Sequence, residues 1–387
     1  MPENSRSSPK YFVIADPNSH RWKKYSEAIE HSGKLGKALD WKLIPWSELL
    51  DCRGALHELI SQDAAGLLRI ESPGRDFEIT RQLIWIGVET SSNPPFQFPE
   101  LEEKLGWLVH PKLFHQGLRS ILMNLHESME RMPHLRSLRK AAHLASMFDK
   151  SETCRKLESA GISTPEILDE SELEACEDAS ALVSLLRDKW PMAYIKLNTG
   201  SSGSGIVVLN CRTGTCMTTM KEIDGEFFNT LRIQSLDAVA TNRAINYLLS
   251  EDVCVQKAIP LGTIDGEYFD VRVIVINSKV EFTVFRLSRN PITNLHLGGR
   301  RGNWQSCRDA IPNRLWLDAM SECVETASMY DVQAMGIDLV FDRRFMNHYI
   351  LEINGFGDFV PGWTNPQGQT IHQRQIELTY QQFSSGF

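Results

Sequence analysis

The sequence lacks the apolar runs and cysteine patterns that mark membrane-spanning, secreted and zinc-binding proteins. No stretch approaches the roughly 20 apolar residues that a membrane span needs, and the N-terminal segment is too polar for a signal peptide. The eight cysteines run from Cys52 to Cys323 without paired metal spacing, and the closest pair, Cys211 and Cys216, has no second pair to complete a zinc site. We therefore expect a reduced, cytoplasmic protein with no membrane partner.

Several nucleotide-binding and nucleic-acid-binding signatures are also missing. The formal net charge is -8 and no basic stretch offsets it, which argues against a nucleic-acid partner. No GxGxxG follows the first apolar run, which argues against a dinucleotide site there. Internal repeats and long low-complexity segments are absent as well. A chain of 387 residues is expected to fold as two or three packed subdomains.

The N-terminal third alternates strand and helix patterns. Tyr11–Ala15 predicts a strand and His20–His31 a helix, and Trp41–Pro45 leads into a second helix with Ser47 as its candidate N-cap. Units of this kind indicate an α/β layer with a parallel sheet. Further along the chain, Ser151 is the candidate N-cap of another helix.

A dense cluster of charge, ESPGRDFE, spans Glu71–Glu78 around a Pro-Gly turn. The favoured interpretation is a solvated turn. The alternative is that Arg75 and its neighbours line a substrate pocket, because loops at the ends of parallel strands bind ligands in such sheets.

The segment Ala193–Leu209 predicts a strand, a Gly/Ser loop and a second strand. Lys196 lies on the first strand, and the glycines allow the loop backbone to approach an anion closely. No Gly-Lys-Ser/Thr ends the loop and a strand follows it, so it is not a Walker loop. A phosphate-binding loop and a flexible hairpin tip both remain open, and Lys196 favours the first.

Two apolar strand patterns further along the chain each contain an arginine. Phe269–Ile276 predicts a buried strand with Arg272, and Lys279–Leu287 is expected to pair with it and carries Arg286. An arginine in so apolar a strand is costly unless it meets an anion, which makes Arg272 a candidate for anion binding. Further arginines follow nearby, of which the last two are equally explained as solvated charge: Arg289, Arg300 and Arg301.

Near the C-terminus, two short apolar runs carry oxygen-bearing side chains. Gly336–Phe341 and Tyr349–Ile353 predict a hairpin. Because side chains alternate across a strand, Glu352 and Asn354 share one face, and Asp338 is expected opposite Glu352 on that face. Two carboxylates and an amide oxygen suit a hard cation such as Mg²⁺. The alternative is a half-exposed hairpin with scattered acids.

The order of these features resembles the ATP-grasp superfamily. The shared features are two lysines on either side of a helix, a Gly/Ser loop, a strand that ends in a hinge, a buried Asp-x-Arg, the segment TNLHLGG and the Gly-x-Asp…Glu-x-Asn hairpin. The likeness is greatest to the glutamate-ligase and ribosomal-protein-modification branch. It covers the chain from about Leu138 to Asp358, and its most specific parts are TNLHLGG and LEIN.

The resemblance implies a role for each matching residue. Those expected to hold ATP are Lys150 and Lys196 at the phosphates, the closing loop Gly200, Ser201, Ser202, Gly203, Ser204 and Gly205, and the adenine hinge Gln256, Lys257, Ala258 and Ile259. Arg272 and Arg286 are expected to face the transferring phosphate or the acyl phosphate, and Asn294 is expected to help hold the phosphate or the metal. Those expected to bind Mg²⁺ are Asp338, Glu352 and Asn354. Two departures from the family are Lys257, where relatives often carry glutamate, and Gly355–Asp358, where they often continue with Ser-Pro-Gly.

The resemblance also implies an α/β fold. Two α+β ATP-grasp subdomains would grip ATP, preceded by a small Rossmann-like α/β domain, with boundaries at 1–137, 138–259 and 260–387. The implied activity is ATP-dependent carboxylate–amine ligation on an amino acid or peptide substrate. ATP would phosphorylate a substrate carboxylate to give an acyl phosphate and ADP, and a nucleophile, most often an amine, would then displace the phosphate. Mg²⁺ is the expected ion, with Mn²⁺ as an alternative. A small-molecule kinase and a non-catalytic ATP-binding regulator are the competing interpretations, and the two substrates and the oligomeric state stay open.

Overall fold

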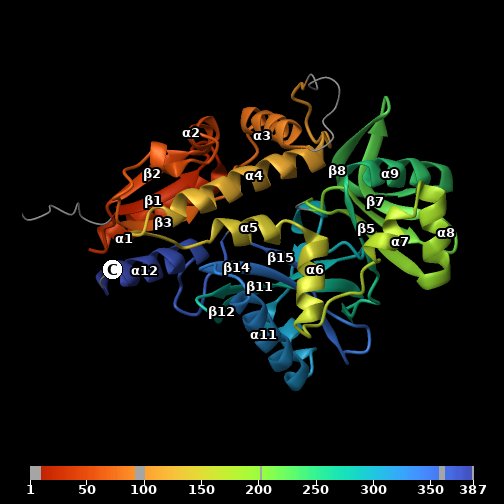
Figure 1. Cartoon of the computed structure of the whole chain (residues 1–387). Helices are drawn as coiled ribbons and strands as arrows, with labels where there is room; N and C mark the ends of the chain where they lie inside the picture. The colour runs from red at the N-terminus through yellow and green to blue at the C-terminus, as the bar shows by residue number, and fades with distance from the viewer. Residues whose placement is uncertain (1–9, 92–100, 201–202, 357–361, 386–387) are drawn as a thin grey trace, which may run out of the picture.

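The computed structural model describes residues 10–91, 101–200, 203–356 and 362–385, and within these ranges the strands form three sheets. Figure 1 shows the N-terminal sheet in red and orange at one side, a green sheet at the other side and a blue sheet between and below them. In the described ranges, every helix is too short or too polar to cross a lipid bilayer.

The first sheet is parallel, with the strand order β2-β1-β3-β4, as the alternating strand and helix patterns predict. Its strands are Lys10–Ala15 (β1), Trp41–Pro45 (β2), Gly66–Ile70 (β3) and Leu135–Ser137 (β4). The accompanying helices are His20–Lys34 (α1), Trp46–Asp51 (α2), Leu56–Glu58 (η1), Phe77–Thr90 (α3) and Pro111–Glu130 (α4). The prediction of Ser47 as an N-cap is wrong, because the chain turns into α2 directly from the extended backbone of Pro45.

The second sheet is antiparallel, with the order β8-β7-β6-β5-β9. Its strands are Met192–Leu197 (β5), Ile206–Asn210 (β6), Cys216–Ile223 (β7), Glu226–Leu236 (β8) and Val253–Lys257 (β9). The nearby helices are Glu170–Glu174 (α7), Ala179–Lys189 (α8) and Ala238–Glu251 (α9), of which α8 and α9 bury apolar side chains against the sheet. The Gly/Ser loop connects β5 to β6, in agreement with the predicted strand–loop–strand pattern.

The third sheet is antiparallel, with the order β13-β12-β11-β14-β15 and β10 beside β11. Its strands are Thr263–Ile264 (β10), Glu267–Ile276 (β11), Lys279–Ser288 (β12), Arg300–Arg301 (β13), Ala334–Phe341 (β14) and His348–Asn354 (β15). The helical segments that accompany it are Leu295–Leu297 (η2), Trp304–Asp309 (α10) and Asn313–Ser328 (α11), and α11 packs apolar side chains onto the sheet. The four strands predicted between Phe269 and Ile353 are all present.

Two short helices lead from the first sheet to the second: Ala141–Met147 (α5) and Lys150–Ser159 (α6). The prediction of Ser151 as the N-cap of α6 is wrong. Asp149 caps the helix instead, with its Oδ1 accepting a hydrogen bond from the backbone N–H of Glu152 at 2.7 Å. A carboxylate suits this place because it also meets the positive end of the helix dipole. Lys150 is therefore the first residue of the helix.

The last helix, Ile371–Ser384 (α12), returns to the N-terminal sheet. Its Ile376 packs in the same core cluster as Tyr11 and Tyr25, and Figure 1 shows α12 beneath the first sheet. The division at residues 137 and 259 stays a prediction, and it would assign this helix to a different domain from the one whose core it completes.

Candidate functional site

A cavity of about 1420 Å³ is lined by residues of the second and third sheets and of the N-terminal loops. The predicted site residues that line it are Lys150, Lys196, Gly200, Gly203, Gln256, Lys257, Ile259, Arg272, Arg286, Asn294, Asp338, Glu352 and Asn354. Three predicted residues are not part of this lining: Ser204, Gly205 and Ala258. Ser201 and Ser202 lie outside the described residues.

The two predicted phosphate-binding lysines enter the cavity from different elements. Lys196 on β5 is buried, and its Nζ donates to Oε1 of Gln256 on the neighbouring strand β9 at 2.5 Å. Lys150 donates its Nζ to the carbonyl of Gly200, and the same Nζ lies 3.5 Å from Oε1 of Glu352. Lys150 therefore connects the Gly/Ser loop to the strand that carries the predicted metal ligands.

Asn198 is a buried residue that the sequence analysis did not identify. Its carbonyl accepts from the backbone N–H of Lys150 at 3.1 Å, and its Oδ1 accepts from the N–H of Ser151 at 2.9 Å. Its Nδ2 donates to Oδ2 of Asp252 at 3.2 Å. Asn198 thereby fixes the start of α6. The only signal in the sequence is an amide residue placed between a buried strand and a glycine loop.

The Gly/Ser loop lies against both sheets. A Cβ on Gly203 would lie 3.2 Å from Cδ1 of Leu297 and 3.4 Å from Nδ2 of Asn294, so the loop reaches the third sheet's connecting segment. Gly205 has a φ of +62°, and a Cβ there would lie 2.4 Å from Cδ1 of Leu197. Glycine is therefore required at position 205 by both conformation and space. Asn294 itself caps η2, with its Oδ1 accepting from the N–H of His296 at 2.8 Å.

The two predicted arginines are paired with two aspartates in the wall of the cavity. Arg272 donates from Nε to Oδ1 of Asp338 at 2.5 Å and from Nη2 to Oδ2 at 3.2 Å. Arg286 donates to both carboxylate oxygens of Asp270, at 2.7 and 2.5 Å, and its Nη2 lies 3.0 Å from Oδ2 of Asp338. Asp270 also accepts from Oγ1 of Thr293 at 2.6 Å. The strand register explains the pairing, because Asp270 lies opposite Arg286 and Arg272 opposite Asp338.

These two carboxylates have opposite pKa shifts. Burial would raise the pKa of Asp338, but the Arg272 and Arg286 guanidinium groups outweigh it and hold this pKa below its ordinary value. Burial raises the pKa of Asp270, with the nearby Asp338 acting in the same direction and Arg286 opposing both. Asp338 is thus held ionised between two guanidinium groups.

The C-terminal hairpin forms as predicted, with Asp338 opposite Glu352 and Gly336 opposite Asn354. β14 is buried along its length, and β15 is partly exposed. The side chains have different partners: Asp338 contacts the arginines and Glu352 contacts Lys150, whereas the buried Nδ2 of Asn354 has no hydrogen-bond partner among the described residues. Within those residues, histidines, cysteines and acids form no group of three that could hold a metal ion.

The comparisons with known proteins agree with this geometry. Residues 141–376 match the model of a family described as YheC/D-like ATP-grasp. The chain belongs to this ATP-grasp family. The match confirms the predicted superfamily and its α/β fold, while the glutamate-ligase and ribosomal-protein-modification branch stays a prediction. The curated proteins contain no match to the sequence.

Solved structures share the fold of this ATP-grasp chain at low sequence identity. The ATP-grasp ligase PsnB, complexed with a minimal precursor, has a TM-score of 0.53 at 12% identity and covers 97% of this chain and 100% of its own. D-cycloserine synthetase DcsG has a TM-score of 0.52 at 9% identity and covers 96% of this chain and 99% of its own. At these identities the likeness concerns the fold alone.

The predicted adenine hinge of the ATP-grasp chain is tied to a neighbouring loop. Gln256 is buried, whereas Lys257 is partly exposed and its Nζ lies 2.9 Å from Oε2 of Glu166. The backbone N–H of Lys257 donates to the carbonyl of Glu166 at 2.9 Å, and that of Ala258 donates to the carbonyl of Met192 at 3.1 Å. Two of the hinge N–H groups are therefore already used within the protein.

The N-terminal loops of the ATP-grasp chain also line the cavity. Arg75 is among these lining residues and is exposed, as the pocket interpretation of this segment expects. Glu71 is only 1% exposed, so the solvated-turn interpretation is wrong for this residue. The reason is Arg69, two residues earlier on the same face of β3, whose Nε donates to Oε1 of Glu71 at 2.5 Å.

The three remaining arginines of the sequence cluster are exposed. Arg289 is exposed, and Arg300 is exposed and pairs with Glu267. Arg301 lines the cavity although it is also exposed. The five arginines that follow one another in the sequence therefore do not form one cluster.

Proposed function

We propose that the chain is an ATP-dependent carboxylate–amine ligase that forms an acyl phosphate and releases ADP and phosphate. The observation that carries this proposal is that Lys150, Lys196, Arg272 and Arg286 line one cavity together with the oxygen-bearing side chains of the C-terminal hairpin. Phosphoryl transfer depends mainly on positioning and on neutralising charge, which is what such a set of side chains supplies. No side-chain nucleophile is needed.

In this proposal the lysines bind the nucleotide and the arginines bind the reacting group. Lys150 and Lys196 would neutralise the ATP phosphates, since they flank the Gly/Ser loop. Arg272 and Arg286 would face the transferring phosphoryl group and the acyl phosphate. Their pairing with buried aspartates supports this role, because it holds both guanidinium groups in fixed directions before the substrate arrives.

Asp338, Glu352 and Asn354 would hold Mg²⁺, or Mn²⁺ in its place. The donor chemistry fits, because two carboxylates and an amide oxygen are hard ligands. The buried Asn354 Nδ2, which has no partner among the described residues, would donate to an acceptor such as a phosphate oxygen, while Oδ1 would face the ion. Asp338 would be shared with the two arginines that already contact it. Bound there, the ion would neutralise phosphate charge during transfer.

We further propose a peptide as the first substrate class to test. The ATP-grasp ligase PsnB has been solved with the precursor peptide PsnA2 and AMPPNP, and it shares the fold of this chain. The cavity here also extends from the predicted nucleotide site to α1 and to the start of α12. That extent supports a substrate larger than a free amino acid.

The test supplies Mg²⁺-ATP with pooled amino acids, amines and cell peptides, and measures ADP and AMP together with the mass of any product. Hydroxylamine then separates two outcomes, because an acyl phosphate yields a hydroxamate and a phosphorylated alcohol does not. ADP release with hydroxamate formation supports the ligase, and ADP release without it indicates a kinase. AMP release, or no nucleotide turnover with any pool, contradicts the proposal.

A matched pair of variants tests whether the activity depends on the residues that line this cavity. Glu352→Gln changes a lining carboxylate, whereas Glu267→Gln changes a carboxylate of the same sheet that pairs with the exposed Arg300. We expect turnover to be lost in the first variant and kept in the second. Equal turnover in both variants would remove Glu352 from the proposed site.

A further inference from the structure

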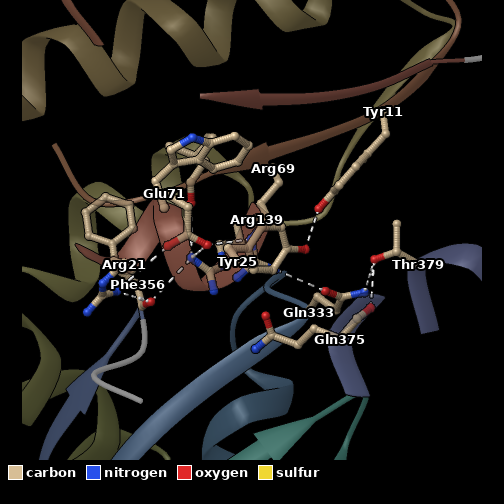
Figure 2. A network of polar contacts seen from close by, with 12 residues as sticks. Tyr11, Arg21, Tyr25, Arg69, Glu71, Arg139, Gln333, Phe356, Gln375 and Thr379 are labelled. Atoms are coloured by element: carbon tan, nitrogen blue, oxygen red, sulfur yellow. Dashed lines mark hydrogen bonds and ion pairs between the residues drawn. The ribbon is translucent and has the colours of Figure 1, made fainter. Parts of the chain in front are cut away.

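A buried group of charged side chains, which we call the Glu71 cluster, consists of Arg21, Arg69, Glu71 and Arg139 (Figure 2). Arg69 and Arg139 are fully buried, and Glu71 is nearly so. Arg69 donates to Oε1 of Glu71 at 2.5 Å, Nη1 of Arg139 lies 3.5 Å from the same oxygen, and Nη1 of Arg21 lies 3.8 Å from Oε2. Three guanidinium groups therefore surround one carboxylate.

The electrostatics of the Glu71 cluster show that its positive charge exceeds its negative charge. Burial alone would raise the pKa of Glu71, but Arg69, Arg139 and Arg21 lower it to about 2. Burial, and after it the neighbouring Arg69, lowers the pKa of Arg139 to about 9. Buried charge is costly unless other polar groups meet it, so the oxygen acceptors around these guanidinium groups matter.

The backbone carbonyl of Phe356 is the acceptor through which the Glu71 cluster reaches the candidate metal site. Nη1 of Arg21 donates to this carbonyl at 2.6 Å, and Nη1 of Arg139 does so at 3.4 Å (Figure 2). Phe356 is the second residue after Asn354, which ends β15. Guanidinium groups from α1 and from the segment after β4 thus hold the exit of the strand that carries Glu352 and Asn354.

The same two residues after Asn354 are also held by packing. A Cβ on Gly355 would lie 2.8 Å from Cδ2 of Leu144, so the backbone runs tightly along α5. The ring of Phe356 packs on that of Phe148, with centroids 5.2 Å apart. The packing fixes one part of this segment, and the guanidinium groups fix the direction of its carbonyl.

We propose that Glu71 and Arg21 are positioning residues for the metal site. Glu71 holds the guanidinium of Arg21, and Arg21 fixes the carbonyl of Phe356 and with it the direction in which Asn354 points. This inference rests on the proposed function, because it takes Asn354 as a metal ligand. A purely structural role, in which the Glu71 cluster only ties the first sheet to the third, predicts lower stability with unchanged metal binding.

The test measures Mn²⁺ binding in the presence of saturating β,γ-imido-ATP, from the electron paramagnetic resonance signal of free Mn²⁺. This measurement needs no turnover and no knowledge of the substrates. Arg21→Gln is expected to weaken Mn²⁺ binding about 10-fold, as is usual when a group that orients a metal ligand is lost. Glu71→Gln is expected to act in the same direction. Arg21→Lys should give a smaller loss, because a lysine Nζ can still donate to the carbonyl.

The matched control is Tyr11→Phe. It removes a buried hydrogen bond of the same region, the 2.7 Å contact between the hydroxyls of Tyr11 and Tyr25, and leaves Phe356 untouched. We expect a lower melting temperature and an unchanged Mn²⁺ affinity. Folded Arg21→Gln with wild-type Mn²⁺ affinity overturns the positioning role. If that variant does not fold, Glu71→Gln decides, and wild-type affinity in folded Glu71→Gln overturns it. A wild-type protein that binds no Mn²⁺ with the nucleotide overturns the proposed function instead.

Discussion

Replacing Asp270 by asparagine changes the charge of the cavity wall while keeping the size of the side chain. In the wild type, Asp270 and Asp338 balance Arg272 and Arg286, so these four side chains carry no net charge. Asp270→Asn leaves one positive charge in excess. It also takes away the carboxylate that holds both ends of the Arg286 guanidinium fork.

The structure sets the size of the effect on stability. Asp270 is 3% exposed and accepts bonds from Nε and Nη2 of Arg286 and from Thr293. Removing one partner of a buried ion pair costs about 3–5 kcal/mol. Arg286 keeps Asp338 at 3.0 Å, and asparagine keeps one acceptor oxygen, so we expect a loss of about 2–3 kcal/mol of unfolding free energy. Thr293→Val removes only one neutral donor and should cost about 1 kcal/mol.

Two assays separate the effects of Asp270→Asn. Urea unfolding gives the stability loss, and titration with ADP gives nucleotide affinity. We expect affinity to be kept or increased, because the extra positive charge attracts phosphate. Turnover of the substrate found by the pooled screen should fall about 10- to 100-fold, because Arg286 loses its fixed direction. A fall in ADP affinity with unchanged turnover would refute this reasoning and move Arg286 to the nucleotide side.

Three further predictions follow from single sites. Glu352→Ala should abolish Mg²⁺-dependent ADP release and leave the melting temperature nearly unchanged; unaltered release would contradict the metal assignment. Gly205→Val should weaken ATP binding in a titration, because its side chain would collide with Leu197 in a left-handed conformation. Burial raises the pKa of Glu251 to about 7 from 4.5, so the folded state prefers the protonated acid. Protonated Glu251 therefore contributes fully to the free energy of unfolding below pH 4.5, and this contribution is lost as the pH rises through 7. Glu251→Gln should therefore gain about 3 kcal/mol over the wild type between pH 4.5 and 8 in urea unfolding, and parallel pH profiles would contradict this.

The parts of the fold that depend on local pattern could be predicted from the sequence. Alternation with a period of two placed Glu352 and Asn354 on one face and Asp338 opposite Glu352, and the register agrees. The strands with Arg272 and Arg286 were predicted from their apolar runs, and both are present. An arginine among β-branched residues also indicated that an anion is nearby, although its anions in the structure are aspartates of the protein.

The parts that depend on distant partners could not be predicted. Glu71 resembles a turn residue in the sequence. Its partner Arg69 is only two residues away, but the guanidinium groups of Arg21 and Arg139 that complete its surroundings come from other segments of the chain. Asn198 has its effect through α6, which precedes it by many residues. The prediction of the N-cap of α6 was wrong for a different reason. Asp149 and Ser151 are equally good local signals for an N-cap, and only the path of the chain decides between them.

The contact between Lys150 and Glu352 couples the binding of the metal to the binding of the nucleotide. Lys150 lies 3.5 Å from Glu352, so the same carboxylate is a partner of a lysine and a proposed ligand of the metal. A divalent cation at Glu352 would compete with Lys150, and the released ammonium would be free to meet a phosphate. The metal would bind Glu352 and the nucleotide would bind Lys150, so each would break the Lys150–Glu352 ion pair that opposes the binding of the other. Metal and nucleotide would therefore favour each other's binding. Glu352 thus links the two halves of the proposed site, the lysines of α6 and β5 and the acids of the third sheet.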